Sequence, residues 1–346
     1  MSENQVNQGS DDMLYYVHMT PEQIQKFQKN FPSILVNEPM SKHTNMRIGG
    51  PAELYLTATD ADELADAVEM ANKEAIPFYV FGGGSNLLVS DEGYKGLMIQ
   101  IGFRDVKVRE KTVIVDAGAI TSAVARQSVT EGLEGMEWAG TLPGTIGGAV
   151  YGNSGCWGGE MKDVVVTVDA IKLADNKRVV YPNAQCRFGY RDSLFKHEPH
   201  IILRATLGLK TATDPASVKA RMDEYAAQRK QSQPFTESSA GCMFKNFTFQ
   251  DESELERLKN DVKEIPPEML AKKSISAGWL VAQIGMKGER IGDAEISDKH
   301  GNFILNLGNA RAQDVLMLTS KAKMKIRDEY NIMLEDEVEL VGFDVV

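Results

Sequence analysis

The run Phe78-Tyr79-Val80-Phe81-Gly82-Gly83-Gly84-Ser85-Asn86 decides the fold class. Its first four residues are apolar and β-favouring, which predicts a short buried strand, and the three glycines predict a loop at the carboxyl end of that strand. A helix with apolar residues at helical spacing is predicted just before it, from a cap at Thr59 to Pro77. A helix, a strand and a glycine loop in this order indicate an α/β unit with a ligand loop.

The glycine loop is better suited to binding a phosphate group than to forming a Rossmann dinucleotide site. The third glycine of a GxGxxG turn is missing, so a Rossmann dinucleotide site is not supported. Successive glycines still expose backbone N–H groups as an anion nest, and Ser85 and Asn86 add side-chain donors. A second region, 139–159, holds eight glycines among apolar and aromatic residues. We interpret it as an ordered loop laid against the same ligand rather than as a linker.

A third stretch, 238–246, reads SSAGCMFKN. Gly241 permits a positive φ or a close approach to a ligand, while Cys242 offers a proton donor or a nucleophile. Lys245 and Asn246 offer donors to an anion. The alternative for this stretch alone is a small buried thiol followed by a solvated lysine.

Composition limits the function classes. The net charge of −11 argues against broad binding of nucleic acids or anionic membranes, which need basic surfaces. The three cysteines and five histidines show no metal-ligand spacing, so we expect no metal site, and a reducing compartment fits best. No segment approaches the roughly 20 apolar residues of a membrane span. About the first dozen residues are polar and acidic, which predicts a disordered extension without a signal peptide.

The remaining pattern predicts alternating helices and strands. Thr20-Pro21 is typical of a helix start, here over 19–31. Apolar residues at three- and four-residue spacing predict a helix over 314–327, and a further helix is expected over 215–231. Strands are expected over 53–56, 97–101, 113–116, 164–171, 178–181 and 338–341.

Six motifs together carry a family resemblance. In chain order they are GGGSNLLV (82–89), GTLPGTIGGAV (140–150), GYRDS (189–193), SAGCMFKN (239–246), AGWL (277–280) and LEDEV (334–338). They resemble the UDP-N-acetylenolpyruvoylglucosamine reductases, and the similarity runs from about residue 41 to 342. The resemblance implies an α+β protein: an FAD-binding fold of the vanillyl-alcohol-oxidase type in two lobes, plus a smaller α/β substrate-binding domain.

The resemblance also implies the ligands and their residues. FAD would bind non-covalently, NADPH would be the co-substrate, and UDP-N-acetylglucosamine enolpyruvate would be reduced to UDP-N-acetylmuramate in the cytoplasm by a monomer. The catalytic positions would be Arg191, Cys242 and Glu337. The flavin contacts would be Arg47, Gly82, Gly83, Gly84, Ser85, Asn86, Leu87, Gly140, Thr141, Pro143, Gly144, Thr145, Gly147, Gly148, Asn153 and Gly155. The substrate contacts would be Tyr190, Lys230, Lys245 and Asn246.

The chemistry explains the three catalytic residue types. Hydride addition to the enol ether builds an enolate next to a carboxylate, which a guanidinium such as Arg191 stabilises. An ion pair with Asp192 is the alternative for Arg191. A general acid must then protonate the carbanionic carbon, and this chain has Cys242 where the family usually has serine. Glu337 would hold the enol oxygen or a water, unless it is a solvated charge.

We expect the domains to run over 1–40 (extension and short helix), 41–107 completed by 331–346 (first flavin lobe), 108–230 (second lobe) and 231–330 (substrate domain). No extra loop is evident between Leu209 and Pro234, which predicts the shorter family type without a tyrosine flap. Two alternative functions stay open from the sequence: a flavin-dependent oxidase of hydroxy acids or sugars with the same fold, and a flavin- or nucleotide-binding protein without catalysis.

Overall fold

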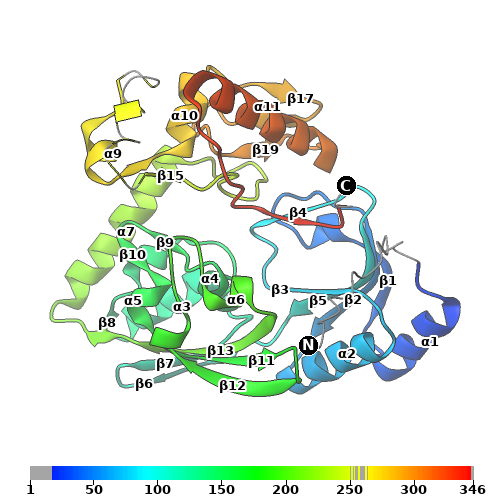
Figure 1. The fold of residues 1–346 in the computed structure, drawn as a ribbon. Helices are drawn as coiled ribbons and strands as arrows, with labels where there is room; N and C mark the ends of the chain where they lie inside the picture. The colour runs from blue at the N-terminus through cyan, green and yellow to red at the C-terminus, as the bar shows by residue number, and fades with distance from the viewer. Residues whose placement is uncertain are drawn as a thin grey trace, which may run out of the picture.

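The computed structural model describes residues 18–343, apart from 250, 252, 254–255, 258–261 and 263. The predicted N-terminal extension lies outside the described residues. Figure 1 shows the chain as three regions: a blue-to-cyan lobe, a green lobe, and a yellow-to-red region that packs across both. None of the helices in the described ranges has the length and apolarity needed to cross a membrane.

The first lobe is built on a four-stranded sheet in the order β1-β2-β5-β3. Its strands are β1 (Leu35–Pro39), β2 (Pro51–Ala58), β5 (Tyr94–Ile101) and β3 (Phe78–Phe81). β2, β5 and β3 run parallel, and β1 joins antiparallel at the edge. The predicted strand Phe78–Phe81 is confirmed, and the glycine loop leaves its carboxyl end.

Two helices cover this lobe. α1 (Pro21–Asn30) begins after Thr20, as the Thr-Pro pair predicts, and Thr20 and Gln23 also exchange hydrogen bonds in a capping box. α2 (Ala61–Lys73) is capped by Asp60 rather than by the predicted Thr59, because the Asp60 carboxylate accepts from the first free backbone N–H groups. The Thr59 hydroxyl instead donates to Glu63 at 2.7 Å between the two oxygens.

The second lobe holds a five-stranded antiparallel sheet in the order β12-β11-β13-β7-β6. Its strands are β12 (Lys177–Pro182), β11 (Val165–Lys172), β13 (His200–Gly208), β7 (Thr112–Asp116) and β6 (Val106–Arg109), and α3 (Thr121–Thr130) and α4 (Ile146–Tyr151) pack beside it. One apolar core runs through both lobes, from Leu97 and Ile99 on β5 to Val113 and Val115 on β7. The two lobes therefore form a continuous framework for the loops between them.

The third region begins where α7 (Pro215–Ser232) leaves the second lobe. It contains α10 (Ala277–Gln283), the antiparallel sheet β17 (Arg290–Ile291), β18 (Ala294–Ile296) and β19 (Ile304–Asn306), and α11 (Ala312–Tyr330). The apolar positions predicted for α11, including Val315, Leu318 and Ile326, are buried against this sheet. The smaller elements of the chain are η1 (Met40–Lys42), β4 (Leu87–Val89), β8 (Leu133–Glu134), η2 (Glu137–Ala139), β9 (Gly155–Cys156), β10 (Gly159–Glu160), α5 (Met161–Val164), η3 (Asn183–Gln185), α6 (Leu194–His197), β14 (Lys210–Thr211), β15 (Phe247–Thr248), α9 (Pro267–Ala271) and β16 (Ser274–Ile275).

The chain then returns to the first lobe. β20 (Glu339–Val341) pairs in parallel with β4, directly after the glycine loop. Figure 1 shows this red segment running from the third region down to β4. The third region also holds the loop that carries Arg47, because the Asn306 amide donates to the Met46 carbonyl at 2.9 Å. These connections bring residues far apart in the sequence to one place.

Candidate active site

The two glycine-rich loops meet face to face. A Cβ atom built on Gly82 would lie 2.1 Å from the Thr145 hydroxyl oxygen, and one built on Gly144 would lie 2.5 Å from the Ser85 hydroxyl oxygen. Gly144 also has a φ of +91°. Only glycines allow this approach, so the glycine content of both loops follows from their contact with each other.

The residues at this junction fit a bound flavin nucleotide. The Thr145 hydroxyl is buried and has no hydrogen-bond partner among the residues that the structure describes. A buried hydroxyl without a partner is costly, so a ligand oxygen facing it would satisfy it. Gly83, Ser85 and Gly148 keep part of their surface exposed at the same junction and supply further N–H and O–H donors. Arg47 lies on the rim with an exposed side chain and a φ of 54°.

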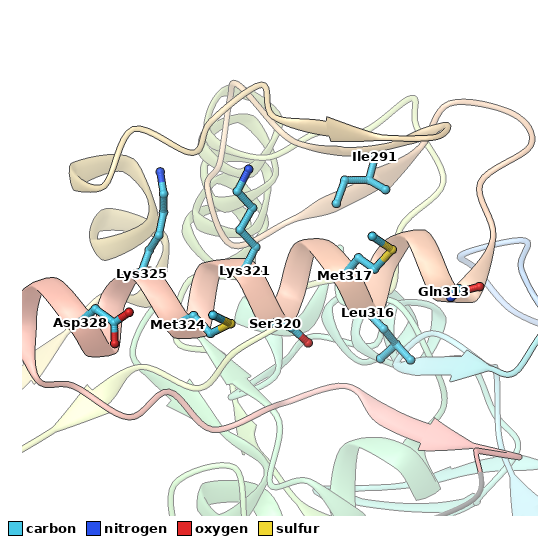
Figure 2. Close-up of a pocket in the computed structure, with 9 residues that line it drawn as sticks. All are labelled: Ile291, Gln313, Leu316, Met317, Ser320, Lys321, Met324, Lys325 and Asp328. Atoms are coloured by element: carbon cyan, nitrogen blue, oxygen red, sulfur yellow. The ribbon is translucent and has the colours of Figure 1, made fainter.

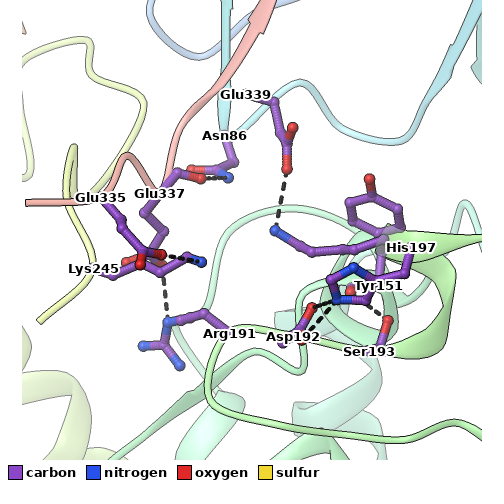
Figure 3. A network of polar contacts seen from close by, with 11 residues as sticks. Asn86, Tyr151, Arg191, Asp192, Ser193, His197, Lys245, Glu335, Glu337 and Glu339 are labelled. Atoms are coloured by element: carbon purple, nitrogen blue, oxygen red, sulfur yellow. Dashed lines mark hydrogen bonds and ion pairs between the residues drawn. The ribbon is translucent and has the colours of Figure 1, made fainter. Parts of the chain in front are cut away.

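The third region places Glu337 against Arg191. The Arg191 Nε–H donates to the Glu337 carboxylate at 2.9 Å (Figure 3). Its terminal nitrogen donates to the Gly155 carbonyl at 3.0 Å. The alternative partner predicted for Arg191 is excluded, since Asp192 pairs with His197 at 2.8 Å. Arg191 has a φ of 53°, so the turn that aims it is conformationally restricted.

Asn153 fixes the turn that carries Arg191. Its side chain is fully buried and donates to the Gly189 carbonyl at 2.7 Å and to Glu160 at 2.8 Å, and it accepts from the Lys162 N–H at 2.9 Å. All three hydrogen bonds of the Asn153 side chain are made to other residues of this chain. Asn153, which the resemblance offered as a flavin contact, thus joins loop 153–162 to the turn before Arg191.

Cys242 is partly buried in a loop and forms an isolated antiparallel β-bridge with Phe303. Asn302 holds the residues after it, because its side chain accepts from the Phe244 N–H at 2.9 Å and donates to the Phe244 carbonyl at 2.8 Å. Burial raises the pKa of the Cys242 thiol to about 12, against the opposing effect of the Arg191 and Arg229 charges. The thiol therefore keeps its proton at neutral pH.

Backbone hydrogen bonds tie Glu337 to the loop after β3 and to the Cys242 segment. Its carbonyl accepts from the Asn86 side-chain amide at 2.8 Å, and its N–H donates to the Met243 carbonyl at 2.8 Å. Burial raises the pKa of the Glu337 carboxyl, while the Arg191 charge acts in the opposite direction. One backbone segment thus links the three residues Arg191, Cys242 and Glu337 to the loop after β3.

The residues expected to contact the substrate divide into two groups. Tyr190 is 42% exposed and its hydroxyl accepts from the Asn246 N–H at 3.2 Å, so these two residues are neighbours. Lys245 pairs with the exposed Glu335 at 3.1 Å on the same side. Lys230, in contrast, is exposed on the last turn of α7, and its ammonium group makes no hydrogen bond or ion pair with the described residues.

The structure adds two cations that sequence reasoning missed. Arg229, on the last turn of α7, is half-buried. Burial lowers the pKa of its guanidinium, and the Cys156 and Cys242 thiols act in the opposite direction. Lys196 pairs with Glu339 at 3.2 Å and lies over the Tyr151 ring. Basic residues in the last turn of a helix are usually solvated charges, so neither sequence position carried a signal.

Two surface hollows lie away from Arg191 and Glu337. One of about 460 Å³ lies on the outer face of α11, lined by Ile291, Leu316, Met317 and Met324 (Figure 2). A smaller one of about 240 Å³ runs beside Trp157 and Tyr225. Neither contains a residue of the predicted site.

Comparison with known proteins identifies the class first. Residues 52–180 match the FAD binding domain family, and residues 233–341 match the C-terminal domain of UDP-N-acetylenolpyruvoylglucosamine reductase. The two-lobed FAD-binding fold with an appended domain, predicted from the sequence, is confirmed. The protein is an FAD-dependent oxidoreductase.

The relatives give the family. UDP-N-acetylenolpyruvoylglucosamine reductase of Caldanaerobacter subterraneus is 34% identical over 89% of this chain and 94% of its own length. That of Chloroflexus aggregans is 36% identical over 88% of this chain and 96% of its own length. The crystal structure of the reductase from Thermus caldophilus has 34% identity and a TM-score of 0.70, covering 89% of this chain and 98% of that one. The chain belongs to the UDP-N-acetylenolpyruvoylglucosamine reductase family, whose members act in peptidoglycan precursor synthesis.

Proposed function

We propose that this protein reduces UDP-N-acetylglucosamine enolpyruvate to UDP-N-acetylmuramate with NADPH, through non-covalently bound FAD. The observation that carries the proposal is the Arg191–Glu337 contact of 2.9 Å next to the Cys242 segment. Residues 146 positions apart meet there, beside the two glycine loops. When bound, FAD supplies the hydride that adds to the terminal carbon of the enolpyruvyl group.

Arg191 stabilises the charge that this addition creates. Negative charge develops on the ether-bearing carbon and spreads into the adjacent carboxylate as an enolate. The Arg191 guanidinium has two contacts that hold its plane, to Glu337 and to the Gly155 carbonyl. A guanidinium held in this way does not have to reorganise when the charge appears.

Cys242 supplies the proton that completes the product. The S–H bond breaks, a C–H bond forms at the carbanionic carbon, and the thiolate regains a proton from solvent. Burial favours the neutral thiol, so the proton is present at the start of the step. An enolate carbon is basic enough to take a proton from such a weak acid.

Glu337 acts beside the ether oxygen of the substrate. Burial raises the pKa of this carboxyl. A carboxylate that takes up a proton more readily during the reaction can then donate a hydrogen bond to that oxygen or to a positioned water. The Asn86 and Met243 contacts fix the backbone on both sides of its Cα atom. The same contacts join this carboxyl to the loop expected to hold the cofactor.

We assign the flavin to the junction of loops 82–87 and 140–148, with Arg47 at its edge, and the substrate to the side of Tyr190, Lys245 and Asn246. The division into lobes 41–107 with 331–346 and 108–230, and a substrate domain 231–330, follows the strand pairing of β20 with β4. Between 210 and 232 the chain forms only β14 and α7. This supports the family type without a tyrosine flap.

The test follows NADPH absorbance at 340 nm with the purified yellow protein. A fall that depends on added UDP-N-acetylglucosamine enolpyruvate supports the proposal. Two results together would refute the proposal for the flavin-bound protein: NADPH oxidation that does not depend on this substrate, and rapid oxygen consumption with hydroxy acids or sugars. They would indicate the oxidase function instead. UDP-N-acetylglucosamine, which lacks the enolpyruvyl group, is the control ligand.

A further inference from the structure

A second ion pair lies beside the Arg191–Glu337 pair. Glu337 accepts from Arg191 at 2.9 Å, and Glu339 pairs with Lys196 at 3.2 Å between nitrogen and oxygen. The two carboxylates belong to the segment that enters β20, whereas the two cations belong to the stretch 191–197 that ends in α6. Two charge pairs therefore join the same two segments of the chain.

Lys196 is held in place by more than its charge. Only 18% of its side chain is exposed, and its ammonium nitrogen lies 5.3 Å from the centroid of the Tyr151 ring. An ammonium group over an aromatic face gains a favourable cation–π interaction. The start of α6 is also bonded to Tyr151, because the buried Ser193 hydroxyl donates to the Tyr151 carbonyl at 2.7 Å. Lys196 therefore presents a preorganised charge to its partner.

Glu339 is fixed on the other side of the pair by Asn86. The Glu339 N–H donates to the Asn86 carbonyl at 3.0 Å, and the Asn86 side-chain amide donates to the Glu337 carbonyl at 2.8 Å. β20 continues this contact by pairing with β4. Glu337 and Glu339 therefore keep a fixed backbone relation to each other and to loop 82–87, while their cation partners belong to the second lobe.

The Lys196–Glu339 pair reinforces the contact that carries the proposed function. Without it, Arg191–Glu337 would be the one ion pair left between the two segments in the part of the chain that the structure describes. Burial raises the pKa of the Glu337 carboxyl, and the Lys196 charge is among those that lower it. Lys196 thus acts on Glu337 through the shared backbone and also through its charge.

We infer that Lys196 and Glu339 are positioning residues, whose ion pair holds the second lobe against β20 at the separation at which Arg191 and Glu337 meet. The inference rests on the proposed function, in which Arg191 and Glu337 act on the substrate. Misplacing a reacting group by about 1 Å can slow a reaction about 100-fold, so a second contact that fixes the separation is useful. The pair should therefore matter for substrate reduction and not for the preceding reduction of the flavin.

The experiment follows flavin absorbance by stopped flow in the holoenzyme and measures each half-reaction separately. Lys196→Met removes the charge and keeps an apolar stem over the Tyr151 ring. It should slow reoxidation of the reduced flavin by UDP-N-acetylglucosamine enolpyruvate about fivefold, the loss expected when one partly buried ion pair no longer contributes. Reduction of the flavin by NADPH should change less than about twofold. Lys177→Met is the matched control, because Lys177 forms an exposed pair of 3.1 Å with Asp175 in the same lobe.

Further variants separate positioning from general stability. Glu339→Gln should slow reoxidation by the same factor, and Lys196→Met/Glu339→Gln should be no slower than either single variant, because all three remove one interaction. Lys196→Arg keeps the charge and should stay within about twofold of the wild type. In a Glu337→Gln background, Lys196→Met should add less than about twofold, since the ion pair that it positions is already gone.

Unchanged reoxidation in Lys196→Met would overturn the inference. An equal slowing of both half-reactions would overturn it too, as would a fivefold loss that persists in the Glu337→Gln background. Loss of flavin from Lys196→Met, measured by the ratio of flavin to protein absorbance, would assign the pair to cofactor retention instead. A wild-type protein whose reduced flavin is not reoxidised by the enolpyruvyl compound would refute the proposed function and the inference with it, whereas normal wild-type turnover with unaffected variants would overturn the inference alone.

Discussion

Gly82→Ala should separate the two glycine loops. The new Cβ atom would lie 2.1 Å from the Thr145 hydroxyl oxygen and 3.3 Å from Thr145 Cβ. The hydroxyl would have to move by about 1.3 Å to reach ordinary van der Waals distance. Thr145 is buried at the start of α4, so its backbone has little freedom to move. Overpacking of this kind costs about 1–3 kcal/mol of folding free energy.

The assay is urea unfolding of the holoprotein, together with the ratio of flavin to protein absorbance. Thr145→Ala removes the clashing oxygen, so Gly82→Ala/Thr145→Ala should recover most of the stability that Gly82→Ala loses, with a coupling energy of about 1–3 kcal/mol. Gly152→Ala is the control, because its Cβ atom would find nothing closer than 3.7 Å. Full stability and flavin content in Gly82→Ala, or strictly additive losses in the double variant, would refute the contact between the loops.

Two further predictions concern Cys242 and the residue that anchors the turn before Arg191. Cys242→Ser should stay active, whereas Cys242→Ala should stall after flavin oxidation has begun, as seen by stopped-flow absorbance; full turnover of the alanine variant would remove Cys242 from the mechanism. Asn153→Ala should lower the free energy of unfolding by about 2 kcal/mol, since it removes the two hydrogen bonds that the buried Asn153 amide donates to Glu160 and to the Gly189 carbonyl. It should also lower kcat/KM, because the turn before Arg191 loses its anchor; urea unfolding and NADPH kinetics measure the two effects, and an unchanged kcat/KM would contradict the positioning role.

Periodic elements could be predicted from the sequence because their signals are local. The apolar spacing in α11 and the strand before the glycine loop are set by residues within a few positions of each other. The cap of α2 shows the limit of such signals. Thr59 and Asp60 are adjacent acceptors, and only the geometry of the first turn shows that Asp60 takes the N–H groups.

The site was predictable as a set of motifs but not as a network of contacts. Motif order indicated Arg191, Cys242 and Glu337, yet the pairing of Arg191 with Glu337 rather than Asp192 depends on where β20 returns. Arg229 could not be found in this way. An arginine followed by a lysine at a helix end is typical of solvated charges, whereas Arg229 is half-buried in the folded chain.

Glu337 and the two arginines act on the proton of Cys242 in opposite directions. Burial is the largest cause of the raised pKa of Cys242, the Glu337 charge raises that pKa further, and the Arg191 and Arg229 charges lower it. Glu337→Gln removes the negative charge and leaves both cations, so the pKa of Cys242 should fall and its thiolate fraction should rise at any pH below the pKa.

Iodoacetamide reacts with the thiolate, so alkylation of Cys242 should be faster in Glu337→Gln than in the wild type across the range from pH 7 to about 10. Peptide mass spectrometry separates Cys242 from Cys186, whose buried thiol has its pKa raised to about 11 by burial and serves as the internal control. An equal increase at both cysteines would indicate general loosening of the fold. An unchanged or slower reaction at Cys242 alone would show that Glu337 does not act on the thiol. The assignment of these two residues to one proton-transfer site would then fail.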